Sequence, residues 1–200
     1  MKKISFEYCS LKYLTIYQQI DKEIITGLKL ENKTGRIDFL KKGATAFRIA
    51  RNFSGFEQSE NKQKILSILD KIEKPKTENE TIDTVKYFSN QLTSLFPVKN
   101  YYSASSKFLW LKFQSPIIIM DSRTIKALDK KLKPENYKDY YSLWKTEYSK
   151  NEKEIKKCCS LLPSVKSYFY NPEMDIIEII NSKWFHERVF DIYLWEKGGE

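Results

Sequence analysis

The regular spacing of apolar side chains is the feature that most constrains the fold of this chain. Between residues 82 and 95, apolar side chains recur every three or four positions, as Ile82, Val85, Phe88, Leu92 and Leu95. This is the period of one face of an α-helix, not of a strand. The same spacing returns in an aromatic stripe made of Tyr137, Tyr141, Trp144, Tyr148, Ile155 and Cys158. The sequence therefore predicts a mainly α fold.

Composition supports this prediction, and weaker patterns place the other helices. Only 6 glycines and 6 prolines among 200 residues argue against a turn-rich β-sandwich. Further helices are expected over residues 13–24, 37–47 and 65–72, and the segment from Met174 to Trp195 reads as one or two helices. The first of them uses the stripe Tyr13, Tyr17, Ile20 and Ile24. Ile117–Ile119 is either a buried strand, and thus a short β element, or an apolar connection.

One polar stretch, from Lys74 to Glu80, reads as the main internal linker. Within it, Thr77 and Glu80 have the spacing of a capping box, which predicts that a helix begins there. We expect one compact helical unit over residues 1–200, with an N-terminal helical part at 1–74 and a second part at 80–200.

The positive charge of the chain is concentrated in one region. The formal net charge is +9, and the stretch from residue 99 to residue 133 contains eight basic side chains but only two acidic ones. Lysine and arginine that neutralise phosphates release counterions, so a local excess of positive charge favours a nucleic acid as partner. The other interpretation of the charge is ordinary solubility.

Several classes of site are disfavoured by residue counts. The three cysteines (Cys9, Cys158 and Cys159) have no zinc-finger spacing and are too few for a four-cysteine iron–sulfur cluster. A single histidine, His186, argues against a histidine-based zinc site or a Ser/His/Asp triad. The start of the chain lacks the apolar run of a signal peptide, and no stretch approaches membrane-spanning length. We therefore expect an intracellular protein without a metal or other cofactor.

The segment from Tyr101 to Leu128 carries the most informative pair of residues. Lys107 follows a run of serines in which Ser103, Ser105 and Ser106 are good N-cap types for a new helix. Asp121 comes just before the next expected helix, where it would act as a cap. The positive end of a helix, together with partial burial, favours a neutral and nucleophilic amine. A capping aspartate stays ionised, so the pair can attack a sugar carbon and stabilise the developing cation. Without further context, a solvated lysine and a simple N-cap are the alternatives.

These residues resemble the helix-hairpin-helix DNA glycosylases, in particular their 8-oxoguanine-glycosylase-like branch. The resemblance covers roughly residues 82 to 132. It rests on Ser106-Lys107-Phe108-Leu109-Trp110, followed by Pro116-Ile117 and by Ile118-Ile119-Met120-Asp121-Ser122-Arg123. In that superfamily a helix pair grips the DNA backbone, a lysine opens the second helix, and an aspartate follows a proline-containing apolar stretch. The 8-oxoguanine-type branch has no iron–sulfur cluster.

The resemblance implies a helical glycosylase-like part at residues 80–200 and a set of functional residues. Lys107 matches the nucleophile and Asp121 the assisting aspartate of a DNA glycosylase with AP-lyase activity. DNA contacts are expected from Ser105, Ser106, Ser122, Arg123 and Lys126, and base-pocket residues from Trp184, Phe190 and Trp195 on the last helix. The expected partner is double-stranded DNA with a damaged or modified base. The expected state is a monomer in the cytoplasm, associated with the nucleoid if the source is bacterial.

Two departures from the family pattern keep other functions open. The connection from Val98 to Ser106 contains no glycine, whereas the family's hairpin usually uses one to bring backbone N–H groups close to a phosphate. The spacing from Lys107 to Asp121 is also shorter than is usual for the family. A catalytically inactive DNA-binding module of the same fold is one alternative. A protein-interaction domain that docks a partner through its apolar C-terminal helices is another.

Overall fold

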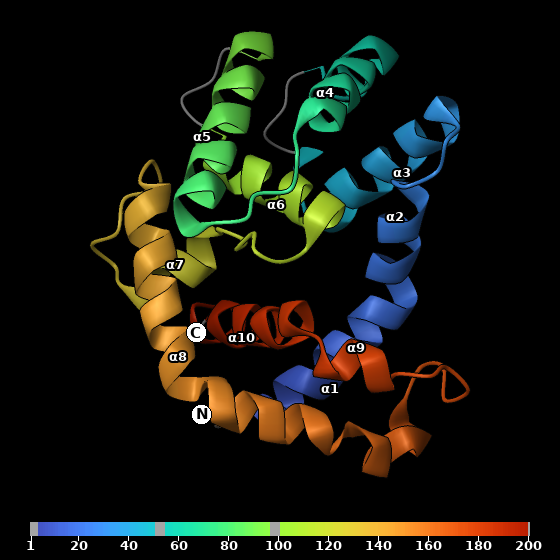
Figure 1. Ribbon diagram of the computed structural model, residues 1–200, viewed down its shortest axis with the longest axis vertical. Helices are drawn as coiled ribbons and strands as arrows, with labels where there is room; N and C mark the ends of the chain where they lie inside the picture. The colour runs from blue at the N-terminus through green and yellow to red at the C-terminus, as the bar shows by residue number, and fades with distance from the viewer. Residues whose placement is uncertain (1–3, 51–54, 97–100, 200) are drawn as a thin grey trace. The chain divides into compact units, whose positions relative to one another are not determined.

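The computed structural model describes residues 4–50, 55–96 and 101–199. All regular secondary structure within these ranges is helical, which confirms the predicted mainly α class. The chain divides into two compact units (Figure 1). We call Ile20–Met120 the continuous unit. We call Met1–Gln19 together with Asp121–Glu200 the discontinuous unit, because it combines the two ends of the sequence.

Within its described residues, the continuous unit contains five α-helices, and its core lies around the last of them. They are α2 (Lys22–Gly27), α3 (Lys33–Ala46), α4 (Ser59–Lys71), α5 (Glu78–Leu95) and α6 (Tyr102–Phe113). Helix α6 packs against α5, α3 and α2, while α4 packs against α3 and α5. Every residue of α6 from Ala104 to Leu111 is buried. A helix that is apolar on most sides belongs inside a domain.

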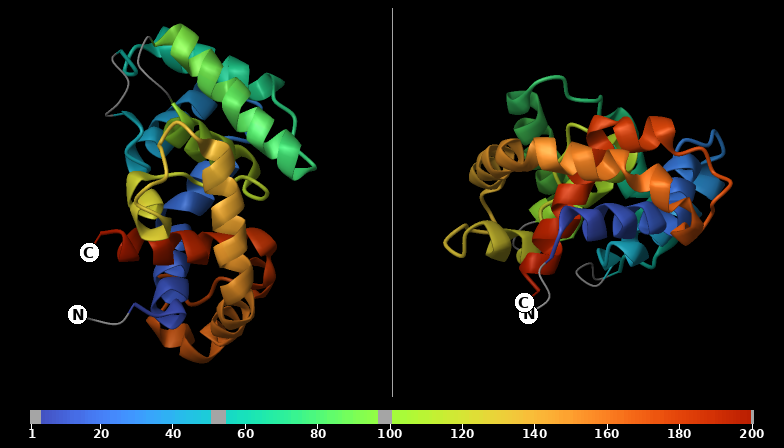
Figure 2. Two further views of the ribbon diagram at one scale, coloured as in Figure 1. Left: turned by 90° about the vertical axis from the view of Figure 1, so that its left-hand side faces the viewer. Right: turned by 90° about the horizontal axis from the view of Figure 1, so that it is seen from below.

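The discontinuous unit is built around the C-terminal helix. It contains α1 (Phe6–Ile16), α7 (Ser122–Leu128), α8 (Tyr137–Ser160), the 3₁₀ segment η3 (Leu162–Tyr168), α9 (Ile177–Asn181) and α10 (Lys183–Lys197). Helix α10 packs against α1, α7, α8 and α9 (Figure 2). The predicted aromatic stripe of residues 137–158 is buried on α8, as expected of a core face. The segment from Met174 onward forms two helices, one of the two predicted possibilities.

The expected stripe over residues 13–24 was wrong in its register. A π-helical turn, η1 (Tyr17–Asp21), separates α1 from α2. A π turn adds a residue to the helical repeat, so the side chains after it rotate away from the face predicted by a continuous α period. Tyr13 and Ile24 are buried, but Ile20 is 38% exposed.

The polar stretch 74–80 is a connection but does not divide the units. Helices α4 and α5, which flank it, both belong to the continuous unit and pack against each other. The predicted parts 1–74 and 80–200 are therefore not the compact units of the structure. The predicted cap is present, since Thr77 Oγ1 accepts a hydrogen bond from Glu80 N at 3.2 Å. The Glu80 carboxylate instead accepts from Lys76 N at 2.7 Å.

Candidate functional site

The lysine-bearing helix begins earlier than the serine pattern predicted. Helix α6 starts at Tyr102, with Tyr101 as an N-cap that makes no side-chain capping bond. The backbone N–H of Tyr101 donates to Ser89 Oγ on α5 at 3.1 Å, which attaches the start of α6 to its neighbour. The expectation that one of the three serines caps this helix was therefore wrong. Most of the glycine-free connection between α5 and α6 lies at 97–100, outside the described residues.

Lys107 lies in the second turn of α6, and its side chain is buried. The residue as a whole is only 9% exposed, among neighbours on α6 that are more deeply buried. The favourable field of a helix N-terminus falls off within the first turn. The electrostatic advantage expected for Lys107 from the helix start is thus not provided by its position. Burial remains as the feature that separates Lys107 from an ordinary solvated lysine.

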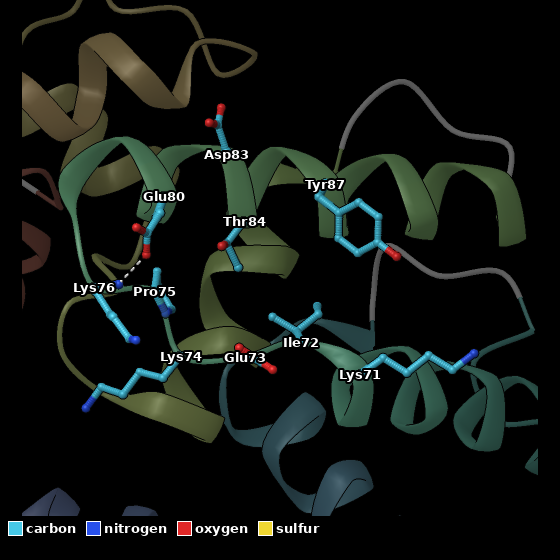
Figure 3. Close-up of a pocket in the computed structure, with 10 residues that line it drawn as sticks. All are labelled: Lys71, Ile72, Glu73, Lys74, Pro75, Lys76, Glu80, Asp83, Thr84 and Tyr87. Atoms are coloured by element: carbon cyan, nitrogen blue, oxygen red, sulfur yellow. Dashed lines mark hydrogen bonds between the residues drawn. The ribbon is translucent and has the colours of Figure 1, made fainter.

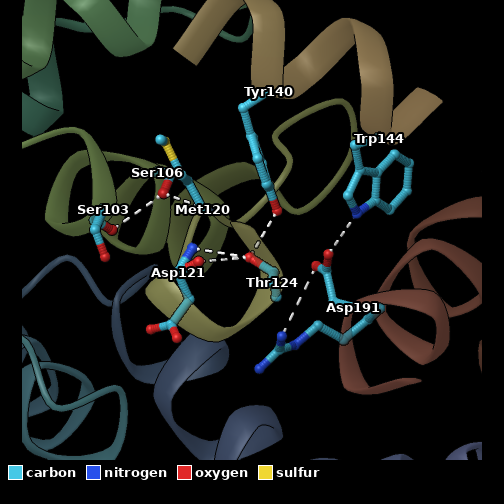
Figure 4. Close-up of polar contacts among 9 residues, drawn as sticks. Ser103, Ser106, Met120, Asp121, Thr124, Tyr140, Trp144 and Asp191 are labelled. Carbon is cyan, nitrogen blue, oxygen red and sulfur yellow. Dashed lines mark hydrogen bonds and ion pairs between the residues drawn. The ribbon is translucent and has the colours of Figure 1, made fainter. Parts of the chain in front are cut away.

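Ser105 and Ser106 are internal residues of the continuous unit, so their predicted role as DNA contacts is corrected. Both residues are fully buried. The Ser106 hydroxyl donates to Ser103 O and accepts from Met120 N, each at 3.0 Å (Figure 4). A serine that uses both its donor and an acceptor inside the protein fixes local structure. Ser106 therefore attaches the end of the apolar segment to α6.

The segment between the lysine and the aspartate is an apolar connection, the second of the two predicted possibilities. Gln114 ends α6 with φ 57° and ψ −115°, a conformation in which a non-glycine residue is strained. Residues Ile117–Met120 follow as buried, non-helical chain. The hydrogen bond from Met120 N to Ser106 Oγ then fixes the residue immediately before Asp121.

Asp121 is the N-cap of α7, as predicted. One carboxylate oxygen, Oδ1, accepts from Arg123 N at 3.1 Å, and Thr124 Oγ1 accepts from Asp121 N at 3.0 Å. The Asp121 side chain also accepts from the backbone N–H of Thr124. This bond and the bond from Asp121 N to Thr124 Oγ1 are reciprocal and form a capping box, which orients the carboxylate. Thr124 also accepts a 3.0 Å hydrogen bond from the buried Tyr140 hydroxyl (Figure 4). Thr124 was missed in the sequence, although its position three residues after Asp121 is the spacing of a capping box.

The basic residues between 99 and 133 do not all lie on a surface. Lys107 is buried, and Lys112 donates to the carbonyl oxygens of Leu69 and Ile72 at the end of α4. Burial lowers the pKa of the Lys112 amine. Lys99 lies outside the described residues. Among the described cations of this stretch, the accessible ones belong to α7 and the segment after it: Arg123 is half-buried, while Lys126, Lys130, Lys131 and Lys133 are exposed. Ser122 is exposed beside them.

The three predicted base-pocket residues do not line one pocket. Phe190 is 1% exposed and packs against Trp144 and Tyr148 in the core. Trp184 packs edge-on against Tyr13 at a centroid distance of 6.5 Å. Trp184 and Trp195 lie eleven residues apart on α10, which is about 16 Å of helical rise. A single flipped base cannot contact both rings at that separation, so this assignment is corrected.

A surface pocket does exist in the continuous unit, beside the connection between α4 and α5 (Figure 3). It is lined by Lys71, Ile72, Glu73, Lys74, Pro75, Lys76, Glu80, Asp83, Thr84 and Tyr87. The lining mixes cations and carboxylates, and none of the residues predicted for the site is among them. The hydrogen bond from Lys76 N lowers the pKa of Glu80, so that carboxylate is already engaged in holding the start of α5.

Metal and thiol chemistry find no support in the described part of the chain. No group of three or more histidine, cysteine, aspartate or glutamate residues there is arranged to hold a metal ion. Burial raises the pKa of the Cys9 and Cys159 thiols to about 12 and that of Cys158 to about 11. Thiols with such values are poor nucleophiles. Within the described residues, no helix combines the length and apolar character that crossing a bilayer requires.

His186 is a structural histidine whose titration should be visible in stability. It is 5% exposed, and its Nε2 lies 2.7 Å from Ile180 O, so the neutral ring donates there. Burial lowers its pKa below 6.5, and the bond to Ile180 O opposes this shift only in part. The unfolded state therefore takes up the proton first as pH falls. We expect the free energy of unfolding to decrease from about pH 7.5 to about pH 5.5, and His186→Gln to lose this dependence.

Urea denaturation at a series of pH values checks this expectation. Lys156 and Glu152 are the charged groups that also influence His186, with opposite effects on its pKa. Glu152 has a lowered pKa of its own, so it stays ionised throughout the range tested. If the free energy of unfolding depends on pH in the same way in wild type and in His186→Gln, then His186 is not the cause of the dependence.

No family model matches this chain, and neither a curated protein nor a solved structure matches it.

Proposed function

We propose that this protein is a DNA glycosylase with AP-lyase activity that removes a damaged or modified base from duplex DNA. Lys107 is the nucleophile, and Asp121 assists it. The proposal extends the resemblance to the helix-hairpin-helix glycosylases, and it is supported by local geometry around both residues.

One hydrogen bond carries most of the support. It joins Met120 N to Ser106 Oγ at 3.0 Å. Ser106 immediately precedes Lys107, and Met120 immediately precedes Asp121, so the bond connects the direct neighbours of the two residues. Fourteen positions of sequence would otherwise allow many arrangements of the chain between them. The bond restricts the path of the chain between Lys107 and Asp121, and this restriction is the local support for proposing that both residues act on one substrate.

Lys107 is only 9% exposed as a residue, which is unusual for a lysine. In the proposed reaction its Nζ, once deprotonated, attacks C1′ of the deoxyribose of a nucleotide that has been flipped out of the duplex. The C1′–N glycosidic bond breaks, and the base leaves with the bonding electrons and takes up a proton. Opening of the sugar ring gives a Schiff base between Lys107 and C1′. β-Elimination then removes a proton from C2′, forms a C2′–C3′ double bond and expels the 3′-phosphate, which breaks the C3′–O bond and nicks the strand.

Asp121 would supply the negative charge that this reaction needs. Its carboxylate is oriented by the capping box with Thr124. Positive charge develops on the sugar as the base departs, and a fixed carboxylate stabilises that charge without reorganisation. The same carboxylate can accept a proton from the Lys107 ammonium before attack.

Contact with DNA is assigned to α7 and the segment that follows it. Arg123 and Lys126 lie on α7, and Lys130, Lys131 and Lys133 come directly after it. Phosphate contacts fix the position of a protein on a duplex without reading its sequence. We therefore expect binding that weakens steeply with salt and tolerates any flanking sequence.

Borohydride trapping tests the proposal, and Lys107→Gln is the decisive variant. Borohydride reduces the C=N bond of a Schiff base and leaves protein and DNA covalently joined. Wild type is expected to form an adduct on duplexes that carry 8-oxoguanine or an abasic site. Lys107→Gln removes the only nitrogen that can form the Schiff base in this scheme, so its adduct should be lost completely.

A matched control replaces Lys86, an exposed lysine on α5, with glutamine and should leave trapping unchanged. A Lys107→Gln protein that is trapped as well as wild type would exclude Lys107 as the nucleophile. Salt-dependent DNA binding by wild type without an adduct on any modified duplex would instead identify an inactive DNA-binding module.

A further inference from the structure

Arg123 is held in one orientation by the C-terminal helix. Its guanidinium carbon lies over the Trp195 ring, 4.0 Å from the ring centroid, which is within the range of a cation–π contact. Arg123 belongs to α7 and Trp195 to α10, two helices that pack closely within the discontinuous unit. No sequence pattern predicts this contact, because the two residues are far apart in the chain.

The glycines after α10 complete the contact. A Cβ added at Gly198 would lie 1.9 Å from Arg123 O, so only glycine allows the backbones of α10 and α7 to approach this closely here. A Cβ at Gly199 would lie 2.9 Å from Arg123 Nη1. The chain end therefore packs against both the backbone and the guanidinium of Arg123. Such packing reduces the number of rotamers that the arginine can adopt.

The charge of Arg123 is not neutralised by a carboxylate within the described residues. Lys12, the other cation near Trp195, forms an ion pair with Glu196 and lies 5.9 Å from the ring centroid. Arg123 forms no ion pair with any described residue. A guanidinium that lies over an aromatic ring can still donate from its N–H groups to a phosphate, which a guanidinium binds in a bidentate arrangement.

We propose that Arg123, oriented by Trp195, is a preorganised phosphodiester-binding site of the DNA-contact surface. This inference rests on the proposed function, because the phosphodiester belongs to the DNA on which Lys107 and Asp121 act. Trp195 is a positioning residue in this site: it contacts Arg123 instead of the nucleic acid. Lys126, three residues after Arg123 on α7, lies on the same helical face and provides a second cation nearby.

A double-mutant cycle read out by DNA binding tests this site. The affinity of wild type, Arg123→Gln, Trp195→Leu and the double variant for a duplex with an abasic-site analogue is measured from roughly 50 to 200 mM salt. Arg123→Gln should reduce the slope of log K against log salt by about one. Trp195→Leu should weaken binding roughly fivefold in the wild-type background and leave the Arg123→Gln protein unchanged.

Two further variants separate positioning from folding and from general charge. Trp195→Phe keeps an aromatic face under Arg123 and should retain most of the affinity, even if Trp195→Leu folds poorly. Lys157→Gln removes an exposed positive charge from the last turn of α8, and we expect a salt slope within experimental error of wild type.

The outcomes distinguish this inference from the proposed function. An unchanged salt slope in Arg123→Gln, together with wild-type borohydride trapping, would overturn the phosphodiester site alone. A loss of affinity on Trp195→Leu that is equally large in the Arg123→Gln background would overturn the positioning role. Absence of DNA binding by wild type at every salt concentration would overturn both this inference and the proposed function.

Discussion

Asp191→Ala is expected to lower the free energy of unfolding by about 3 to 5 kcal/mol, as is typical when one partner of a buried ion pair is removed. Asp191 is 2% exposed and accepts a 2.8 Å hydrogen bond from the Trp144 indole N–H (Figure 4). Its other oxygen lies 3.8 Å from Arg188 Nη1. Alanine leaves both donors without this carboxylate in the core of the discontinuous unit. Urea denaturation followed by tryptophan fluorescence measures the change.

Asp191→Asn separates the hydrogen bond from the charge. The amide oxygen of asparagine can still accept from Trp144, but it does not compensate the charge of Arg188. We expect a loss of about 1 to 2 kcal/mol, clearly smaller than that of alanine. A loss below about 1 kcal/mol in Asp191→Ala would contradict the structural role assigned to this carboxylate.

The second large effect is expected at Asp121, on activity and not on stability. Asparagine caps helices about as well as aspartate, so Asp121→Asn should cost less than about 1 kcal/mol of stability. It removes the charge that would stabilise the sugar cation, and the rate of borohydride trapping should fall at least about 100-fold. Single-turnover trapping kinetics together with urea denaturation measure the two quantities in the same preparation.

Asp121→Ala is the matched comparison, because it removes both the cap and the charge. It should show the same loss of rate as Asp121→Asn, with an additional stability loss of about 0.5 to 2 kcal/mol. If Asp121→Asn traps DNA within about threefold of the wild-type rate, Asp121 is only a helix cap. The proposed mechanism would then lose its assisting carboxylate.

Much of the fold could be predicted because the apolar residues that recur along a helix are the ones that pack into the core. Helices α5 and α8 were predicted from stripes that the structure buries along α8 and, in α5, at Val85, Phe88 and Leu92. The caps at Thr77 and Asp121 form as their residue types indicate. Local patterns of this kind need only neighbouring residues along the chain. They are independent of how distant segments pair.

The errors arose where distant contacts override local preference. The serines of α6 are good N-cap residues, yet this helix starts before them, where Tyr101 bonds to Ser89 of α5. The π turn η1 changes the helical phase without a proline or glycine to mark it. The division into units was missed because Met1–Gln19 and Asp121–Glu200 associate across more than half of the sequence. Short-range patterns in the sequence do not predict contacts between segments so far apart.

The candidate site, like the fold, could be predicted from the sequence only in part. The sequence predicted Lys107 and Asp121 as the reacting pair, which stays a prediction, and it predicted Asp121 as a helix cap, which the structure confirms. It could not show that Ser106 is buried and hydrogen-bonded to Met120, nor that Arg123 lies over the Trp195 ring. It also grouped Trp184, Phe190 and Trp195 by residue type, although helical geometry separates them. Residue type indicates possible chemistry, while position on a folded element decides which groups can act together.

Peptide mapping of the borohydride-trapped adduct tests the proposed nucleophile most directly. After trapping on a damaged duplex and digestion of both protein and DNA, mass spectrometry locates the residue that carries the reduced sugar fragment. We predict that the modified residue is Lys107. Modification of another lysine or of the N-terminal amine, with Lys107 unmodified, would contradict the mechanism.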